Sequence, residues 1–393
     1  MLKTICTFSA LSLLVSCSSS DDNQYVPIST PNVTAEFGNN INLNSLSNYA
    51  NQLVPAYITR INNAGNPVTD KGATLGRVLF YDKNLSSDNS ISCATCHIQS
   101  NAFSDSNVAS TGVNGMTDRH AMRLINTRFA NERKFFWDER AINLQAQTTM
   151  PIRNHMEMGY SGANGDPSFD DLVVKLKDIG YYKELFQFVY GSEEITESKI
   201  QSALSQFVNS IQSFDSKYDA GRAFAANDGQ PFANFTPLEN QGKNLFLAPP
   251  QFNATGNRIG GGVGCAGCHA APEFDIAPNS GNNGFIGKIS GAGIDITNTR
   301  APSLRDILKP NGSLNGPLMH TGVITTMITL LGHYDSIELA PGNTNLDPKL
   351  RPNGFGQQLH LTSAEKDALI AFLKTLSGND VYTNPKWSNP FHQ

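Results

Sequence analysis

The chain has 393 residues, of which 39% are hydrophobic and 16% are charged, and its formal net charge is -5. This length allows two or three domains of ordinary size with their own cores. Because no basic run could follow a phosphate backbone, we expect a globular protein without a nucleic-acid partner.

The N-terminus has the pattern of a lipoprotein signal. Lys3 precedes an apolar stretch over 5–15, which is too short to span a bilayer but suits a secretory signal, and small residues lead to Cys17. We expect residues 1–17 to be a signal peptide, Cys17 to carry a lipid in the membrane, and the body to be exported. Its location would be periplasmic or the outer membrane, including the outer surface. An ordinary cleaved signal with an incidental Cys17 is the alternative.

The cysteines outside the signal all belong to two pentapeptides, Cys93-Ala94-Thr95-Cys96-His97 and Cys265-Ala266-Gly267-Cys268-His269. An exported protein would normally pair its cysteines as disulfides, but none is left over here. Two thiols on one helical turn can each form a thioether with a haem vinyl group, and the adjacent histidine can reach the iron. A thioredoxin-like pair or a Cys₄ zinc site would not explain a histidine after both pairs. We therefore predict two covalent c-type haems, with His97 and His269 as iron ligands.

A weak internal duplication surrounds the two pentapeptides. Gly76 to Phe80 precedes the first and Phe103 to Asp105 follows it, while Gly242 to Phe246 precedes the second and Phe274-Asp275 follows it. Two cytochrome-c-like domains are the simplest account, and each would be a small helical bundle around one haem. The expected fold is mainly α.

These observations give an expected division of the mature chain. Residues 18–69 would form a linker and an N-terminal extension, 70–235 the N-terminal domain, and 236–393 the C-terminal domain. Apolar residues at three-and-four spacing predict a helix over Ile200 to Phe214. A capping box at Thr362 to Glu365 opens a second helix that ends at Gly378. The Gly- and Asn-rich stretches 258–264 and 278–293 are expected to be loops.

Further motifs lie between and after the haem sites. They are Phe136-Trp137-Asp138-Glu139-Arg140, Gln147, Pro151, Glu157-Met158-Gly159, Ser213 to Asp219, Arg300 to Leu304, and Pro317-Leu318-Met319-His320-Thr321-Gly322. In this series, from about residue 70 to 377, the chain resembles the bacterial dihaem cytochrome c peroxidase family, which includes the MauG-type enzymes. Glu139 departs from the family pattern, which usually has Gly.

The resemblance implies unequal roles for the two haems. Peroxide would react at the N-terminal haem of His97, and electrons would enter at the C-terminal haem of His269. Cleavage of peroxide needs an open iron face and a group that moves a proton between the two oxygens, for which Glu157 is the candidate. The other residues implied at this chemistry are Gln147 and Pro151 in the same pocket and Trp137 between the haems as an electron relay.

The first departure from the family concerns the N-terminal haem. Peroxidases of the family usually close this iron with a histidine in the loop after the first pentapeptide, but residues 98–119 contain no histidine. Either the iron is open at rest, as in MauG-like members, or His120 or Met116 covers it.

The second departure concerns the sixth ligand of the C-terminal haem. The position of the family's methionine, fourteen residues after His320, is occupied by Tyr334, as in MauG-like members. Tyrosinate stabilises ferric iron, whereas a thioether raises the reduction potential. His333 and Met327 are the alternatives to Tyr334.

A third departure concerns calcium between the domains. His120 stands where the family usually has an asparagine calcium ligand, while Asn315 and Pro317 match positions that would contribute backbone carbonyls. Calcium is therefore an expected cofactor only through the resemblance.

The leading hypothesis is a peroxidase that reduces hydrogen peroxide to water. Its electrons would come one at a time from a small donor, such as a cytochrome c or cupredoxin, or from a quinol-linked donor. The alternative enzyme is a MauG-like oxidase that uses peroxide to withdraw electrons from a protein side chain. A non-catalytic electron carrier or haem sensor is the third class, but it would have no use for Glu157 and Gln147. The resemblance allows a homodimer or a monomer.

Overall fold

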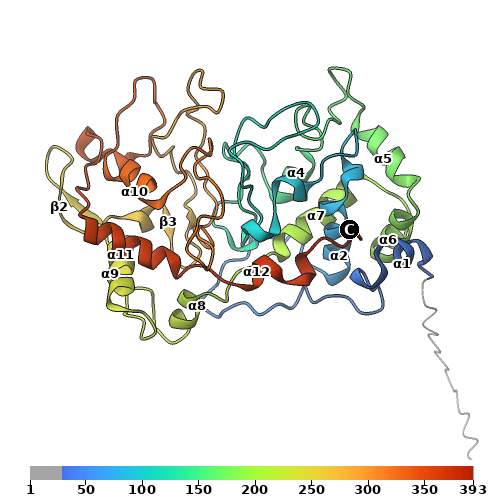
Figure 1. The fold of residues 1–393 in the computed structure, drawn as a ribbon, viewed down its shortest axis with the longest axis horizontal. Coiled ribbons are helices and arrows are strands. Elements are labelled where there is room, and N and C mark those ends of the chain that lie inside the picture. The colour runs from blue at the N-terminus through green and yellow to red at the C-terminus, as the bar shows by residue number, and fades with distance from the viewer. Residues whose placement is uncertain (1–28, 393) are drawn as a thin grey trace, which may run out of the picture.

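The computed structural model describes residues 29–392 and shows two lobes side by side (Figure 1). The expected signal, the acylated Cys17 and the first part of the linker lie outside the described residues. Helices form most of the regular structure, and the strands are short, as a mainly α fold requires. None of the described helices is long and apolar enough to cross a membrane.

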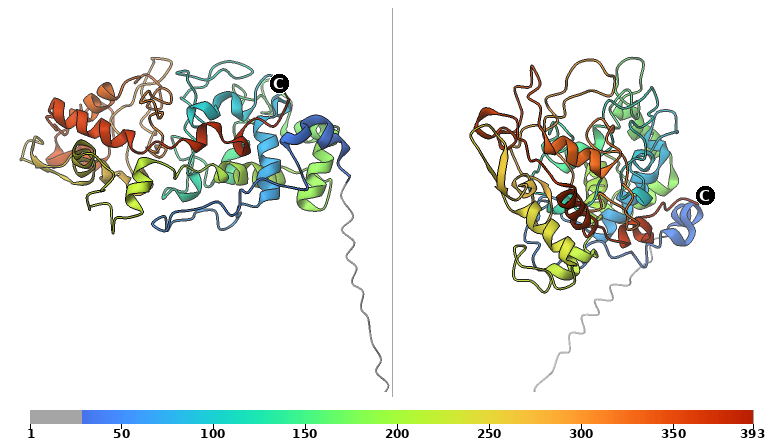
Figure 2. Two further views of the ribbon diagram at one scale, coloured as in Figure 1. Left: turned by 60° about the horizontal axis from the view of Figure 1, so that its bottom comes forward. Right: turned by 60° about the vertical axis from the view of Figure 1, so that its left-hand side comes forward.

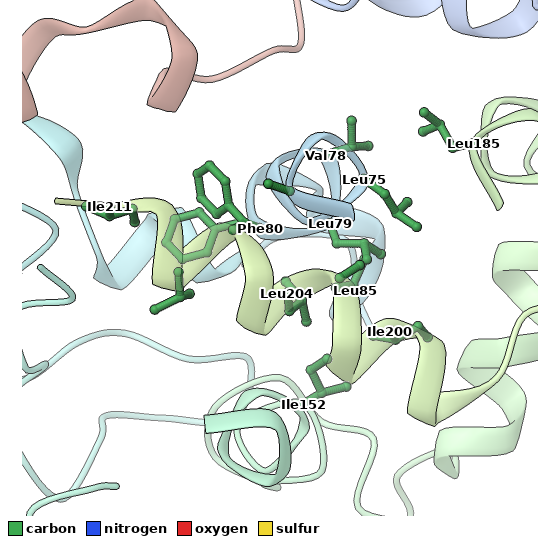
Figure 3. Close-up of a cluster of buried hydrophobic side chains, with 14 of the residues drawn as sticks. Leu75, Val78, Leu79, Phe80, Leu85, Ile152, Leu185, Ile200, Leu204 and Ile211 are labelled. Atoms are coloured by element: carbon green, nitrogen blue, oxygen red, sulfur yellow. The ribbon is translucent and has the colours of Figure 1, made fainter. Parts of the chain in front are cut away.

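The first lobe is a bundle of helices around one buried apolar cluster. Its helices are α1 (Pro31–Phe37), α2 (Asp70–Tyr81), α3 (Cys93–Cys96), α4 (Leu144–Thr149), α5 (Phe169–Lys177), α6 (Gly180–Tyr190) and α7 (Glu197–Ser210). Helix α2 begins where the Thr69 side chain accepts a hydrogen bond from the Gly72 amide. Leu75 and Leu79 of α2 and Leu204 of α7 belong to the central cluster (Figure 3).

The second lobe combines helices with two small antiparallel sheets. Its elements are α8 (Lys217–Arg222), α9 (Pro237–Leu247), β1 (Pro250–Phe252), β2 (Arg258–Gly261), β3 (His269–Ala270), β4 (Asp275–Ile276), α10 (Met327–Asp335) and α11 (Ser363–Lys374). β1 pairs with β2, and β3 pairs with β4. The prediction of a loop over 258–264 is therefore wrong for the residues of β2, because the backbone of β2 pairs with that of β1 as an antiparallel strand.

Both lobes contain the same close helix crossing. A Cβ atom on Gly76 of α2 would lie 2.0 Å from the carbonyl oxygen of Ala203 in α7. A Cβ atom on Gly242 of α9 would lie 1.8 Å from the carbonyl oxygen of Ala368 in α11. Any other residue would push the helices apart, so glycine is required at both crossings. The lobes thus repeat one packing arrangement, as the sequence duplication predicts.

A phenylalanine pair accompanies each crossing. The ring centroids of Phe80 and Phe207 are 5.1 Å apart, and those of Phe246 and Phe372 are 5.3 Å apart. Rings at this separation attract each other beyond the area that they bury.

The change from one core to the other falls earlier than the sequence indicates. Tyr218, Phe232 and Phe235 pack in the second core although they precede the expected boundary at 235 and 236. The chain then leaves α11 and returns to the first lobe (Figures 1 and 2), where α12 (Asp380–Thr383) follows and Trp387 is fully buried. The expected boundary is corrected because aromatic packing, rather than the position of the second haem motif, decides which core each segment joins.

The two predicted helices exist with shorter bounds. α11 has the expected capping box at Thr362 and Glu365 but ends at Lys374. α7 ends at Ser210, before the expected end at Phe214, because Asn126 hydrogen-bonds the next residues. The Asn126 backbone amide donates to the Ile211 carbonyl, and the Ser213 amide donates to the side-chain oxygen of Asn126.

A buried ion pair stabilises the second lobe and allows a stability prediction. The Arg305 guanidinium is fully buried and donates to both carboxylate oxygens of Asp219 at 2.9 and 3.0 Å. We expect Arg305→Met to lower the free energy of unfolding by about 3–5 kcal/mol, because Asp219 would stay buried without its partner. Urea denaturation followed by circular dichroism measures this. The exposed Arg351→Met control should change stability by less than about 0.5 kcal/mol, and equal stability of the two variants would contradict the prediction.

Candidate functional site

The two cysteine pairs lie on short helical turns. Cys93 and Cys96 bound α3, and Cys265 opens a 3-10 turn, Cys265–Gly267. None of the four is in a disulfide in the described part of the chain. Burial raises the pKa of the free Cys93 and Cys265 thiols to about 12. The two pairs line different cavities, so the four cysteines do not converge on one Cys₄ zinc site.

The histidine after each pair is held in the same way. His97 Nδ1 lies 3.1 Å from the Phe103 carbonyl oxygen, and His269 Nδ1 lies 3.1 Å from the Phe274 carbonyl oxygen. Phe103 and Phe274 both have left-handed φ angles, +59° and +56°. This conformation costs a non-glycine residue about 1–3 kcal/mol, and here it accompanies a carbonyl that faces the histidine.

Each imidazole is thereby prepared to bind iron. A carbonyl oxygen only accepts, so Nδ1 carries the proton and Nε2 has the free electron pair. Burial lowers the pKa of His97, and it lowers the pKa of His269 to about 4. Both rings are therefore neutral at physiological pH.

The second pentapeptide lines a large apolar cavity of about 740 Å³, which is within the usual range of cofactor sites. Cys265, Cys268 and His269 form part of its wall. Arg123 reaches this cavity from the first lobe, and its buried Nε has no hydrogen-bond partner among the described residues. Because an acidic group on a bound cofactor could accept from it, the donor set and the lining fit a haem.

The first pentapeptide lines a narrower cavity of about 70 Å³. The structure brings the predicted residues together around it: Cys93, Cys96 and His97 share its wall with Gln147, Pro151 and Glu157. Gln147 comes from α4, and the other two follow that helix in the chain. The donor set is the same as at the second pentapeptide, whereas the cavity is smaller than the usual range of cofactor sites.

Glu157 has an environment suited to proton transfer. Burial raises the pKa of its carboxyl group, against a smaller opposing effect of Arg140. Among the described residues no hydrogen bond or ion pair reaches the carboxylate, whereas its backbone is tightly held. The Asn154 side chain accepts from the Glu157 amide at 3.2 Å, and the Val113 amide donates to the Glu157 carbonyl at 3.0 Å.

The structure does not bring His120 or Met116 to the first cavity. Neither residue lines it, and Met116 is half exposed. His120 instead lines the second cavity. These positions give no support to His120 or Met116 as a cover of the first site, and the open iron stays a prediction.

Of the three candidate sixth ligands, only Tyr334 lines the second cavity; His333 and Met327 do not. His333 Nε2 is bonded to the Asn283 carbonyl at 2.9 Å. Sequence reasoning missed Met319, whose sulfur lies beside Tyr334. The Asn283 amide donates to the Tyr334 hydroxyl at 3.0 Å and to the Met319 sulfur at 3.3 Å. Met319 directly precedes His320 in the motif over Pro317 to Gly322, and this position could have indicated Met319 as a candidate ligand.

Trp137 lies at the junction of the lobes and lines the second cavity. Its Nε1 donates to the His120 carbonyl at 2.8 Å, and its ring centroid is 6.2 Å from that of His320. Burial raises the pKa of Tyr334, farther along the same cavity, to about 12. Trp137 therefore lies on the wall of the second cavity, and its role as an electron relay stays a prediction.

The positions matched to calcium ligands offer few oxygens. Asn315 is buried, and its amide nitrogen donates to the Asp306 carbonyl and the Tyr382 hydroxyl. Its Oδ1 is buried without a partner among the described residues, and Pro317 lines the second cavity. The described residues contain no group of three or more His, Cys, Asp or Glu side chains that could hold a metal ion. The expected ligands at Asn315 and Pro317 are backbone carbonyls, so calcium stays a prediction there, and His120 adds no oxygen ligand to it.

Comparisons with known proteins agree with the site. The family model "Di-haem cytochrome c peroxidase" matches residues 70–226. The chain is 30% identical to the methylamine utilization protein MauG of Methylorubrum extorquens over 79% of both chains. It is 27% identical to the cytochrome c551 peroxidase of Nitrosomonas europaea over 78% of this chain and 80% of that one.

Solved structures show the same fold. The crystal structure of a MauG-like protein associated with microbial copper homeostasis matches 86% of this chain and 99% of its own, with 26% identity and a TM-score of 0.65. The diheme peroxidase BthA from Burkholderia thailandensis matches 84% of this chain and 92% of its own, with 20% identity and a TM-score of 0.58.

Proposed function

Because the chain belongs to the di-haem cytochrome c peroxidase and MauG family, we propose that it reduces hydrogen peroxide to water at the first haem site. Electrons from a small redox protein, a cytochrome c or a cupredoxin, would enter at the second haem site. Each turnover converts one peroxide, two electrons and two protons into two molecules of water. The proposed cofactors are two covalent haems, attached through the two cysteine pairs.

The observation that carries this proposal is the shared wall of Glu157, Gln147 and His97 in the first cavity. A haem held there supplies the iron that binds peroxide and passes electrons to it. Glu157 accepts a proton from one peroxide oxygen and returns it to the other, which leaves as water. Gln147 orients the peroxide by hydrogen bonding, and Pro151 limits the access of water. A carrier would need none of these groups.

Peroxide turnover by the purified two-haem protein tests the proposal. With reduced cytochrome c as the donor, we expect two cytochromes to be oxidised for each peroxide consumed. Oxygen release must be followed in the same assay, because it would reveal disproportionation of peroxide instead. No consumption above that of a heat-denatured sample would refute the peroxidase and favour the carrier or sensor.

A second candidate function is a MauG-like oxidase that withdraws electrons from a protein side chain. Tyr334 on the wall of the second cavity favours it, because tyrosinate would make the second haem a poorer acceptor of donor electrons. In that case peroxide would be consumed without oxidation of cytochrome c, and a modified protein side chain would be found by mass spectrometry.

The identity of the sixth ligand can be decided by two variants. We expect Tyr334→Phe to raise the reduction potential of the second haem and to remove phenolate-to-iron absorption, because tyrosinate stabilises ferric iron. The matched Met319→Leu variant should keep the wild-type spectrum. Spectroelectrochemistry measures both. An unchanged Tyr334→Phe spectrum together with a changed Met319→Leu spectrum would assign the ligand to Met319 instead.

We also propose that the protein works outside the cytoplasm and is anchored through Cys17. The proposal rests on the signal pattern of the sequence, since Cys17 lies outside the described residues. Mass spectrometry of the mature N-terminus tests it. A lipid-modified Cys17 is expected, and an unmodified N-terminus elsewhere would contradict the anchor.

A further inference from the structure

His120 is a buried residue that joins the two lobes through its backbone. Its side chain and backbone together are 5% exposed. Its amide donates to the His320 carbonyl in the second lobe at 2.8 Å, and its carbonyl accepts from Trp137 Nε1 at 2.8 Å. The residue therefore fixes Trp137 relative to the wall of the second cavity.

The imidazole of His120 extends this connection to the loop that follows His97. Its Nδ1 lies 2.9 Å from the Asn107 carbonyl, which only accepts, so Nδ1 carries the proton. Its Nε2 faces the Ser104 hydroxyl at 3.4 Å, but that hydroxyl donates its proton to the Ala121 carbonyl at 3.1 Å. Ser104 follows Phe103, whose carbonyl holds the His97 ring. The His120 ring is thus bonded to the loop after His97 through Asn107, and its backbone carbonyl holds Trp137.

A calcium ion could join the two lobes at this junction only if several oxygen ligands converged there. The side chain at position 120 presents two ring nitrogens and no oxygen, and its Nδ1 already donates to the Asn107 carbonyl. The donor set disagrees with a calcium site, which needs several oxygens around one point.

We propose that the His120 imidazole, in place of a calcium ion, joins the loop of His97 to the wall of the second cavity. His120 is then a positioning residue for electron transfer between the two sites. The positioning role in electron transfer rests on the proposed function, whereas the claim that His120 stands in place of calcium does not.

The test uses the purified full chain with both haems attached. Stopped-flow spectroscopy follows first the reduction of the second haem by the donor and then electron transfer to the first. In the wild type, we expect no stoichiometric calcium by atomic emission and no change of either step after treatment with EGTA. In His120→Asn, we expect the interhaem step to be slower than in the wild type, while the donor step is unchanged.

The matched control is His360→Asn, because His360 is exposed on the second lobe and is bonded to Asn257. It should leave both steps unchanged. The proposal would be overturned by calcium in the purified wild type, by slowing on chelation, or by a wild-type interhaem rate in His120→Asn. Equal slowing of both steps in that variant would indicate a general loss of packing and also overturn the positioning role.

Two features keep the test decisive. Arg119 still connects the lobes in the variant, through Asp138 at 2.6 Å and Asp295 at 2.8 Å, so folding is expected. If the variant nevertheless fails to fold, calcium content and chelation of the wild type decide the question alone. Both readouts are independent of peroxide turnover, so a failure of the proposed function would not be mistaken for a failure of this inference.

Discussion

The Glu157→Gln variant is expected to reduce hydrogen peroxide with a kcat/KM about 10²- to 10⁴-fold below that of the wild type, the usual contribution of a general acid–base group. The amide keeps the size of the side chain but cannot accept a proton from the bound peroxide. Steady-state assays with reduced cytochrome c measure the loss. The haem content, determined by the pyridine haemochrome method, should be unchanged because Glu157 is not an attachment residue.

The pH dependence of this reaction follows from the burial of Glu157. Because burial raises the pKa of its carboxyl group, the protonated form persists above the ordinary range of a glutamate. Protonated Glu157 cannot accept a proton, so kcat/KM should be low at acid pH and rise as the pH passes through this raised pKa. The acid limb should be missing in Glu157→Gln. A wild-type profile that is flat across this range would argue against Glu157 as the proton acceptor.

A matched variant separates the role of Glu157 from the loss of a carboxylate as such. Glu193 is exposed on the first lobe. Glu193→Gln should retain the wild-type kcat/KM and pH profile. If Glu157→Gln and Glu193→Gln behave alike, the catalytic assignment of Glu157 is wrong.

The double variant Cys265→Ala, Cys268→Ala is expected to lose the second haem and the folded state of the second lobe. The cavity that these cysteines line measures about 740 Å³ and its lining is largely apolar, so without the cofactor this apolar surface would be exposed to water. An ordinary domain is stabilised by only roughly 5–15 kcal/mol, which leaves little to offset that loss of burial. The lobe would therefore unfold or collapse without its cofactor.

Mass spectrometry and limited proteolysis measure the two parts of this prediction. The mass should correspond to one haem per chain, and cleavage should begin within residues 218–376 while the first lobe persists. The single Cys265→Ala variant is the control, because one thioether still retains the haem and the lobe should resist protease. A double variant as resistant as the wild type would show that the lobe folds independently of haem.

The haem attachment sites could be predicted from the sequence because their chemistry is local. Two thioethers and one iron ligand must come from a single turn of chain, so the pentapeptides ending at His97 and His269 contain the whole signal. The proposed proton-transfer group could also be named from the sequence, because Gln147, Pro151 and Glu157 are close in the chain and resemble a family motif. Their convergence on one cavity agrees with that expectation.

Other features depend on contacts between residues that are distant in the chain, and only the tertiary structure decided them. The strand at Arg258–Gly261 exists because β1 supplies its hydrogen bonds, and the second core begins at Tyr218 because of aromatic packing. Met319 became a ligand candidate through an amide shared with Tyr334.

His120 shows the same division within one residue. In the sequence it is a departure from a family pattern and a candidate cover for the first haem. In the structure its ring and backbone join Asn107, Trp137 and His320 across the junction of the lobes. Residue type and spacing determine which covalent and acid–base chemistry the chain can perform, since these depend on local groups. The connection between the two sites depends on how the lobes pack, and packing brings together groups that no local pattern relates.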